Sequence, residues 1–246
     1  MTAKQEYEMK SFITYAHRGA SEYCPENTFI SFYRGVEMGA NGIETDVQRT
    51  KDGVLVLFHD DTLDRVTGAE GAVADYTYEE LSKLLVKKGE LTDRIPTLDD
   101  FLCHFAFRDI TFAIELKVGD CEREIADLIF KHGVENKTVV TSFNLEYLCA
   151  FKKHAPTVRV GYLTCTPDEG CIKALADMGA EEICPKGEGM TKEMVDLWHG
   201  MGFNVRAWGI SNEEIMKSVY DIGADGMTVN FPDRLIGYIR TKESEK

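Results

Sequence analysis

An alternation of helical and extended patterns runs along most of the chain. Segments with helical periodicity end in a glycine, and an apolar run of strand length follows within a few residues, at Gly39, Gly133, Gly179, Gly202 and Gly223. Glycine adopts the left-handed backbone conformation at a helix end without steric cost, so the chain can turn back there as a strand. This pattern predicts parallel strands joined by helical crossovers.

The alternation predicts eight strands and the helices that follow them. The strands are expected over 13–17, 42–48, 111–118, 138–143, 159–164, 182–186, 204–210 and 226–230. The helices are expected over 26–38, 121–132, 144–154, 168–178, 191–201, 212–222 and 232–240. Eight such units close into a (β/α)8 barrel, the TIM-barrel fold. An open doubly wound sheet is the alternative, but its G-x-G-x-x-G fingerprint does not follow the first strand.

Residues 49–110 interrupt this rhythm between the second and third strands. The segment contains another strand-like run, GVLVLFHDD, and two helical pieces, TYEELSKLL and TLDDFLCHFA. It is much longer than a crossover requires, and long insertions in compact folds tend to carry function. We therefore expect a single TIM-barrel domain over residues 1–246, with an insertion at 49–110 that includes a small cap over the barrel mouth.

Composition and charge narrow the class of partner. The 246 residues are 43% apolar and 28% charged, which is ordinary for a globular protein. No apolar run is long enough to predict a membrane-spanning helix. The first residues, MTAKQEYEMKSFITYAHRG, lack the apolar core that a signal peptide requires, so none is expected. The net charge of −14 argues against nucleic acid and, more weakly, against an anionic membrane surface. Seven cysteines without CxxC spacing predict reduced thiols in a cytoplasmic protein.

Three carboxylates are expected to converge at one end of the barrel. Glu44 and Asp46 alternate with apolar or β-branched residues on the second strand, so they share one face, and Glu115 ends the third strand. Sites in (β/α)8 barrels lie where strands end. Carboxylates packed together cannot all stay ionised without compensation, and ligation by oxygen alone selects Ca²⁺, Mg²⁺ or Mn²⁺.

Basic and aromatic side chains are expected beside the carboxylates. Arg18 and Lys117 would complete a receptacle for an anion such as phosphate. His17 and His59 can act as general base and general acid. Trp208 is either a pocket wall or a core residue. Together these groups are typical of phosphate ester cleavage.

Each of these features also has a structural explanation. A single E-x-D in a strand, a buried histidine or an E-x-K pair occurs in many proteins without a site, and exposed ion pairs contribute little. What favours a site is the coincidence, because polar pairs end successive strands whose alternate residues are apolar.

The chain resembles the glycerophosphodiester phosphodiesterase family in several motifs. These are AHRGASEYCPENT, GIETDVQRTKDGVLVLFHDDTLDRVTG, IPTLDDF with AIELK, TSFN, VRAWGI and ADGMTVNFPDRL. They occur in the family order and cover nearly the whole sequence. The combination of H-R-G, P-E-N-T, E-x-D, H-D and E-x-K is specific, whereas any one alone is not.

The resemblance implies a fold, an activity and residue roles. It implies a (β/α)8 barrel with a cap inserted after the second strand, and hydrolysis of glycerophosphodiesters to an alcohol and glycerol 3-phosphate with Ca²⁺ or Mg²⁺. By motif, the implied roles are metal ligands at Glu44, Asp46 and Glu115, an acid/base pair at His17 and His59, phosphate contacts at Arg18 and Lys117, and a glycerol pocket wall at Trp208. It also implies attack by the glycerol 2-hydroxyl through a cyclic phosphate, with direct attack by water as the alternative.

Two other functions remain open from the sequence. One is a lipid phosphodiesterase resembling phospholipase C or sphingomyelinase D. Such an enzyme would need exposed apolar or basic surface at the barrel mouth to contact a membrane. The other is a catalytically silent barrel that binds phosphodiesters. The partner expected from the main interpretation is a small-molecule glycerophosphodiester, and the expected assembly is a monomer or homodimer without stable membrane association.

Overall fold

The fold is a closed barrel of eight parallel strands. The structure is a computed structural model that describes residues 12–165 and 167–245. The barrel strands are β1 (Ile13–His17), β2 (Gly42–Arg49), β6 (Thr111–Leu116), β7 (Thr138–Ser142), β8 (Arg159–Thr164), β9 (Glu182–Pro185), β10 (Asn204–Ala207) and β11 (Gly226–Val229). They are hydrogen-bonded in the order β1-β11-β10-β9-β8-β7-β6-β2, and β1 pairs with β2 to close the ring. The predicted TIM barrel is confirmed.

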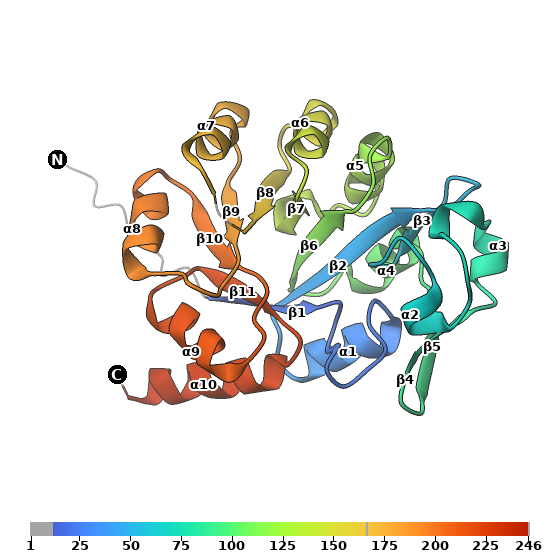
Figure 1. Cartoon of the computed structure of the whole chain (residues 1–246), viewed down its shortest axis with the longest axis horizontal. Coiled ribbons are helices and arrows are strands. Elements are labelled where there is room, and N and C mark those ends of the chain that lie inside the picture. The colour runs from blue at the N-terminus through green and yellow to red at the C-terminus, as the bar shows by residue number, and fades with distance from the viewer. Residues whose placement is uncertain (1–11, 166, 246) are drawn as a thin grey trace.

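Helices surround the strands on the outside (Figure 1). They are α1 (Phe29–Glu37), α4 (Leu98–Phe105), α5 (Glu122–Lys131), α6 (Leu145–His154), α7 (Glu169–Met178), α8 (Lys192–Gly200), α9 (Glu213–Asp221) and α10 (Pro232–Ser244). Polar caps fix where several of them begin; the Thr191 side chain accepts from Met194 N at α8, for example. The five glycines that predicted helix ends all have positive φ, between +65° and +99°.

The core lies between the strands and the helical ring. Phe101 of α4 packs edge-on against Phe112 of β6, with ring centroids 5.6 Å apart, in one cluster of buried residues. A second cluster includes Trp198 of α8 and Val205 of β10. Apolar contact on the outer face of the barrel leaves the inward-facing positions free to carry polar groups at the strand ends.

The segment between β2 and β6 adds elements at one side of the barrel (Figure 1). They are β3 (Leu55–Leu57), antiparallel to β2, then α2 (Asp64–Thr67), the 3₁₀ turn η1 (Val73–Asp75), α3 (Tyr78–Leu81) and the hairpin β4 (Leu85–Lys88) and β5 (Leu91–Arg94). The hairpin was not predicted, because Val86 is its one fully buried residue and the run lacks alternation. The bounds of the insertion expected over 49–110 stay a prediction. Helix α4 lies within that range, yet it packs against α5 and β3 and belongs to the helical ring.

Three predicted boundaries differ from the structure by three residues or more. The helix expected over 26–38 begins at Phe29, because the Thr28 side chain caps it. The strand expected over 204–210 ends at Ala207, after which the chain turns through Gly209 at φ +69°. The helix expected over 232–240 continues to Ser244, since no glycine or proline follows Arg240 before that point. The expectation about a signal peptide concerns residues 1–11, which lie outside the described residues.

Candidate active site

The strand register brings the predicted acidic residues to one end of the barrel. Glu44 on β2 is paired with His17 on β1, and Asp46 on β2 is paired with Glu115 on β6. All three strands run in the same direction, so these side chains lie near their carboxyl ends. That is the end of a (β/α)8 barrel at which active sites are built.

Glu44, Asp46 and Glu115 form a buried acidic triad. One carboxylate oxygen of each lies within 4.8 Å of the others. Burial, and then repulsion from neighbouring carboxylates, raises the pKa of Glu44 well above its usual value and that of Glu115 to about 7. For Asp46 burial also opposes ionisation, but Arg18 and the other nearby basic groups, Lys117 among them, together outweigh it and lower the pKa. The triad therefore concentrates negative charge that its surroundings only partly compensate.

Arg18 and Lys117 supply positive charge beside the triad. Arg18 Nε lies 3.1 Å from Asp46 Oδ2, and Lys117 Nζ lies 2.9 Å from Glu115 Oε1. Arg18 has φ +52°, and its backbone N–H donates to a carboxylate oxygen of Glu44 at 3.0 Å. Left-handed conformations at residues other than glycine persist where the surroundings impose them, often at functional sites.

The donor set of the triad fits a hard divalent cation. Asp46 is fully buried, yet its Oδ1 makes no hydrogen bond with any residue of the described chain. Buried carboxylate oxygens normally accept a hydrogen bond, but the nearest cation to this one, Lys117 Nζ, is 3.8 Å away, so the oxygen can bind a further cation. The triad offers oxygen ligands only, which suit Ca²⁺ and Mg²⁺. It can therefore hold a divalent metal ion.

The His17 imidazole is oriented by a neutral amide. Its Nδ1 lies 2.5 Å from Asn230 Oδ1, which also accepts a hydrogen bond from Ser21 Oγ at 3.0 Å. An amide oxygen only accepts, so Nδ1 carries the proton and Nε2 faces the triad, 3.9 Å from Glu44 Oε2. Burial, followed by the positive charge of Arg18, lowers the pKa of His17 to about 4.

The His59 imidazole is oriented by a carboxylate. Its Nδ1 lies 2.6 Å from Asp60 Oδ1, and the other oxygen of Asp60 accepts from Arg65 Nε at 2.5 Å. Burial opposes ionisation of Asp60, but the hydrogen bonds from Arg65 and His59 hold its pKa at about 2. Arg65 also pairs with Glu26 at 2.6 Å, and Glu26 pairs with Arg18 at 2.9 Å. A continuous chain of ion pairs thus joins His59 to the triad.

Trp208 lies beside a groove at the barrel mouth. Its indole Nε1 donates to Thr164 O at 3.1 Å, and its ring meets the Phe143 ring edge-on at 4.9 Å. Phe143 lines a groove of about 450 Å³ that begins at Glu115 and Lys117. The structure therefore places Trp208 against a wall of this groove, next to the charged cluster.

Five residues of this constellation were given no role from the sequence. They are Glu26, Asn27, Asp60, Arg65 and Asn230, and all fall within quoted motifs. The Asn27 amide donates to Asp46 Oδ2 at 2.9 Å and accepts from Thr45 Oγ1 at 2.8 Å. No spacing rule links these positions to their partners, so only the motifs that contain them could have signalled them: P-E-N-T, H-D-D, TLDRVTG and ADGMTVNFPDRL.

The fold and the site together define the class of (β/α)8-barrel phosphoric diester hydrolases. Residues 17–234 match the model of the glycerophosphoryl diester phosphodiesterase family. A glycerophosphodiester phosphodiesterase from Caldanaerobacter subterraneus is 37% identical over 94% of this chain and 99% of its own, and one from Bacillus altitudinis is 33% identical over 90% and 96%. The chain therefore belongs to the glycerophosphoryl diester phosphodiesterase family, and the predicted membership is confirmed.

Solved structures agree with this assignment. The crystal structure of a putative glycerophosphoryl diester phosphodiesterase from Silicibacter pomeroyi has a TM-score of 0.85 and 25% identity, covering 96% of this chain and 95% of the other.

Within the described residues, no helix is both long and apolar enough to cross a membrane. The seven cysteines form no disulfide within the described residues, and their redox state stays a prediction.

Proposed function

We propose that the protein hydrolyses glycerophosphodiesters to an alcohol and sn-glycerol 3-phosphate, with a divalent metal ion held by the acidic triad. The observation that carries this proposal is the buried Asp46 Oδ1, which lacks a hydrogen bond at the centre of the triad. Two cations and two oriented imidazoles surround it. This is the set of groups that phosphate ester cleavage requires.

Glu44, Asp46 and Glu115 would hold Ca²⁺ or Mg²⁺, with Mn²⁺ as a further option. When bound, the ion supplies positive charge that stabilises the negative charge developing on the phosphoryl oxygens. Arg18 and Lys117 donate to the remaining phosphoryl oxygens, because both side chains have N–H donors and no acceptor. The phosphodiester is thereby fixed next to both imidazoles.

His17 acts as the general base and His59 as the general acid. The protonated Nδ1 of His17 faces a neutral amide, which leaves Nε2 as a proton acceptor. His59 instead faces the Asp60 carboxylate, which fixes the ring, and we assign it the proton transfer to the leaving alcohol oxygen. The two imidazoles thus have hydrogen-bond partners of different charge.

The glycerol 2-hydroxyl attacks phosphorus in the first step. His17 Nε2 takes its proton, a P–O bond forms to the 2-oxygen, the bond to the alcohol breaks, and His59 protonates the departing oxygen. Water then opens the cyclic phosphate: His59 takes a proton from water, and His17 returns one to the 2-oxygen. Trp208 and Phe143 would pack against the glycerol carbons.

The proposal is tested by product formation with defined substrates. Glycerophosphocholine, glycerophosphoethanolamine and glycerophosphoglycerol are incubated with Ca²⁺, Mg²⁺ or chelator, and glycerol 3-phosphate is measured. We expect glycerol 3-phosphate to be released with metal and not in chelator. Glu115→Gln should greatly reduce this release, and Arg123→Gln, at an exposed position, should leave it unchanged. Absence of glycerol 3-phosphate with every substrate, or full activity in chelator, would overturn the proposal.

Two further substrates separate the remaining alternatives. A phosphodiester analogue without the glycerol 2-hydroxyl should not be cleaved, and cleavage at an equal rate would favour direct attack by water. Intact phospholipid should be a much poorer substrate than its deacylated form; the reverse order would indicate a lipid phosphodiesterase. A cytoplasmic location and a monomeric or homodimeric state stay predictions from the sequence.

A further inference from the structure

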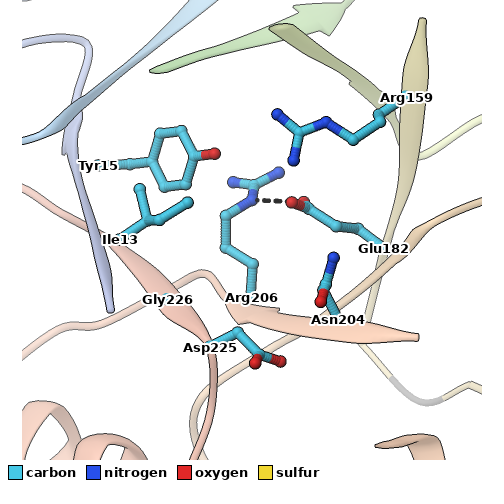
Figure 2. Close-up of a pocket in the computed structure, with 8 residues that line it drawn as sticks. All are labelled: Ile13, Tyr15, Arg159, Glu182, Asn204, Arg206, Asp225 and Gly226. Carbon is cyan, nitrogen blue, oxygen red and sulfur yellow. Dashed lines mark hydrogen bonds and ion pairs between the residues drawn. The ribbon is translucent and has the colours of Figure 1, made fainter. Parts of the chain in front are cut away.

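Another cavity lies at the opposite end of the barrel from the acidic triad. It has a volume of about 250 Å³ and is lined by residues at the amino ends of the strands, among them Ile13, Arg159, Glu182, Asn204 and Gly226 (Figure 2). One water takes up roughly 30 Å³ in the liquid, so a small molecule fits here. This end of a (β/α)8 barrel ordinarily serves stability, and the cavity has no part in the proposed hydrolysis.

Glycines provide the space at this end of the barrel. A Cβ atom at Gly226 would lie 2.7 Å from Ile13 O, and one at Gly42 would lie 2.6 Å from the Tyr15 ring. A Cβ at Gly161 would lie 3.0 Å from Glu182 Cβ. Larger residues at these positions would collide with the lining of the cavity, so the small residues are needed for its present shape.

Arg206 is buried in the cavity wall and is already well satisfied. Its Nε donates to Glu182 at 3.0 Å, its Nη1 donates to Thr228 Oγ1 at 2.8 Å, and its Nη2 contacts Cys184 Sγ at 3.3 Å. Its guanidinium also lies 5.0 Å from the centre of the Tyr15 ring. Because Arg206 and Glu182 neutralise each other, this carboxylate is not available to another cation.

Arg159 and Tyr15 bring unused donors to the same space. Within the described chain, the Arg159 guanidinium forms no ion pair with a carboxylate, and the Tyr15 hydroxyl is buried without a well-aligned hydrogen bond. The nearby Thr111 hydroxyl already donates to Asn41 O at 3.2 Å. In Figure 2 the Tyr15 hydroxyl points toward the guanidiniums of Arg159 and Arg206.

The protonation state of Tyr15 makes its hydroxyl a donor. Burial, with a contribution from Glu182, raises the pKa of Tyr15 to about 12, so the hydroxyl keeps its proton. The remaining carboxylate at the rim, Asp225, accepts from His199 Nε2 and Val205 N, each at 2.7 Å. Both carboxylates that line the cavity, Glu182 and Asp225, are therefore already engaged by other groups.

We propose that this cavity binds a small oxyanion, the size of inorganic phosphate or a short carboxylate, between the Arg159 guanidinium and the Tyr15 hydroxyl. An oxyanion supplies acceptors to both groups and compensates the Arg159 guanidinium, which has no carboxylate partner in the cavity. The site is independent of the acidic triad, and its ligand binds without being transformed.

The test is calorimetric titration of the full chain with inorganic phosphate and with acetate, combined with crystals soaked in each. Titrations use a Lys117→Gln background, which weakens anion binding at the mouth. Arg159→Gln should weaken binding about 10- to 100-fold, as expected for loss of charge-assisted hydrogen bonds. Tyr15→Phe should weaken it about 3- to 10-fold, as expected for loss of a neutral one.

Two further variants serve as controls. Arg159→Lys should keep most of the affinity because it keeps the charge, and Lys153→Gln removes an exposed charge from the end of the neighbouring α6 without effect. Hydrolysis by Arg159→Gln alone should equal that of the unmodified protein. Binding of either probe that depends on Arg159 supports the proposal. Binding of neither, binding that survives Arg159→Gln, or an anion seen only at the mouth overturns it.

Discussion

His17 and His59 are the same residue type beside the same acidic triad, but they have different partners. Asn230 offers His17 a neutral oxygen, whereas Asp60 offers His59 a charged one that Arg65 holds in place. A carboxylate partner stabilises the protonated imidazole, and a neutral amide does not. Single hydrogen bonds thus divide the work of base and acid between identical side chains.

Replacing either histidine should remove most of the activity. We expect His17→Ala and His59→Ala each to lower the rate of glycerol 3-phosphate release by on the order of 10²–10⁴, the usual contribution of general acid–base catalysis. The exposed His154, at the end of α6, provides the matched control as His154→Ala. Unchanged rates in both site variants would contradict the assignment.

The orientation of His59 can be tested through Asp60. Asp60→Asn keeps the size of the side chain but removes its charge, and the turnover number should fall on the order of 10²-fold while KM changes little. Asp61→Asn is the control, since Asp61 is exposed and its side chain accepts from Gln48 rather than from an imidazole. Equal turnover numbers for the two variants would show that Asp60 does not act on His59.

At the scale of the elements, short pieces outside the barrel complete the site. Helix α2 has only four residues, yet it carries Arg65, which bridges Asp60 after β3 and Glu26 in the loop before α1. The hairpin β4–β5 contacts the same loop through Lys88 Nζ and Ser21 O. These ion pairs tie the elements after β2 to the rim of the barrel.

Removing the bridge should loosen this side of the mouth. Arg65→Gln eliminates ion pairs to both Asp60 and Glu26, and we expect kcat/KM to fall about 10-fold or more because His59 and Arg18 both lose a supporting contact. Arg123→Gln on α5 is the control for loss of an exposed arginine. An unchanged kcat/KM would show that the bridge is not needed to organise the site.

At the scale of the whole molecule, the acidic triad lowers the free energy of unfolding when no metal is bound. Its carboxylates lie at the carboxyl ends of β2 and β6, surrounded by the barrel, and burial raises the pKa of Glu44 and Glu115. The folded protein therefore binds protons there that the unfolded chain releases near pH 4.5. A metal ion removes this penalty, because it binds the folded and ionised site.

Stability should accordingly decline with rising pH in the absence of metal, and this decline should be absent when metal is bound. In chelator, the free energy of unfolding should fall as the pH rises from about 4.5 to about 7, by up to about 3 kcal/mol from Glu115. With excess Ca²⁺ or Mg²⁺ the decline should disappear, and Glu115→Gln should reduce it in chelator. Denaturant unfolding at several pH values measures this, and an identical pH dependence in both conditions would contradict it.

The sequence by itself determined the architecture and the chemistry of the strand ends. Glycines such as Gly39 and Gly179 mark helix ends because they alone adopt positive φ freely, and this local property is legible residue by residue. The strand period of two placed Glu44 and Asp46 on one face, and parallel strands brought Glu115 to the same end. Both inferences need only backbone geometry.

Only the tertiary structure decided which distant groups meet. Asn230 reaches His17 across 213 positions of the chain, and Glu26 reaches Arg65 across 39, and no periodicity encodes such contacts. The polar cavity formed by Tyr15, Arg159 and Arg206 likewise exists only because β1 and β8 lie opposite each other in the closed barrel. Local sequence sets backbone conformation, whereas side-chain partnerships depend on where closure of the whole sheet places them.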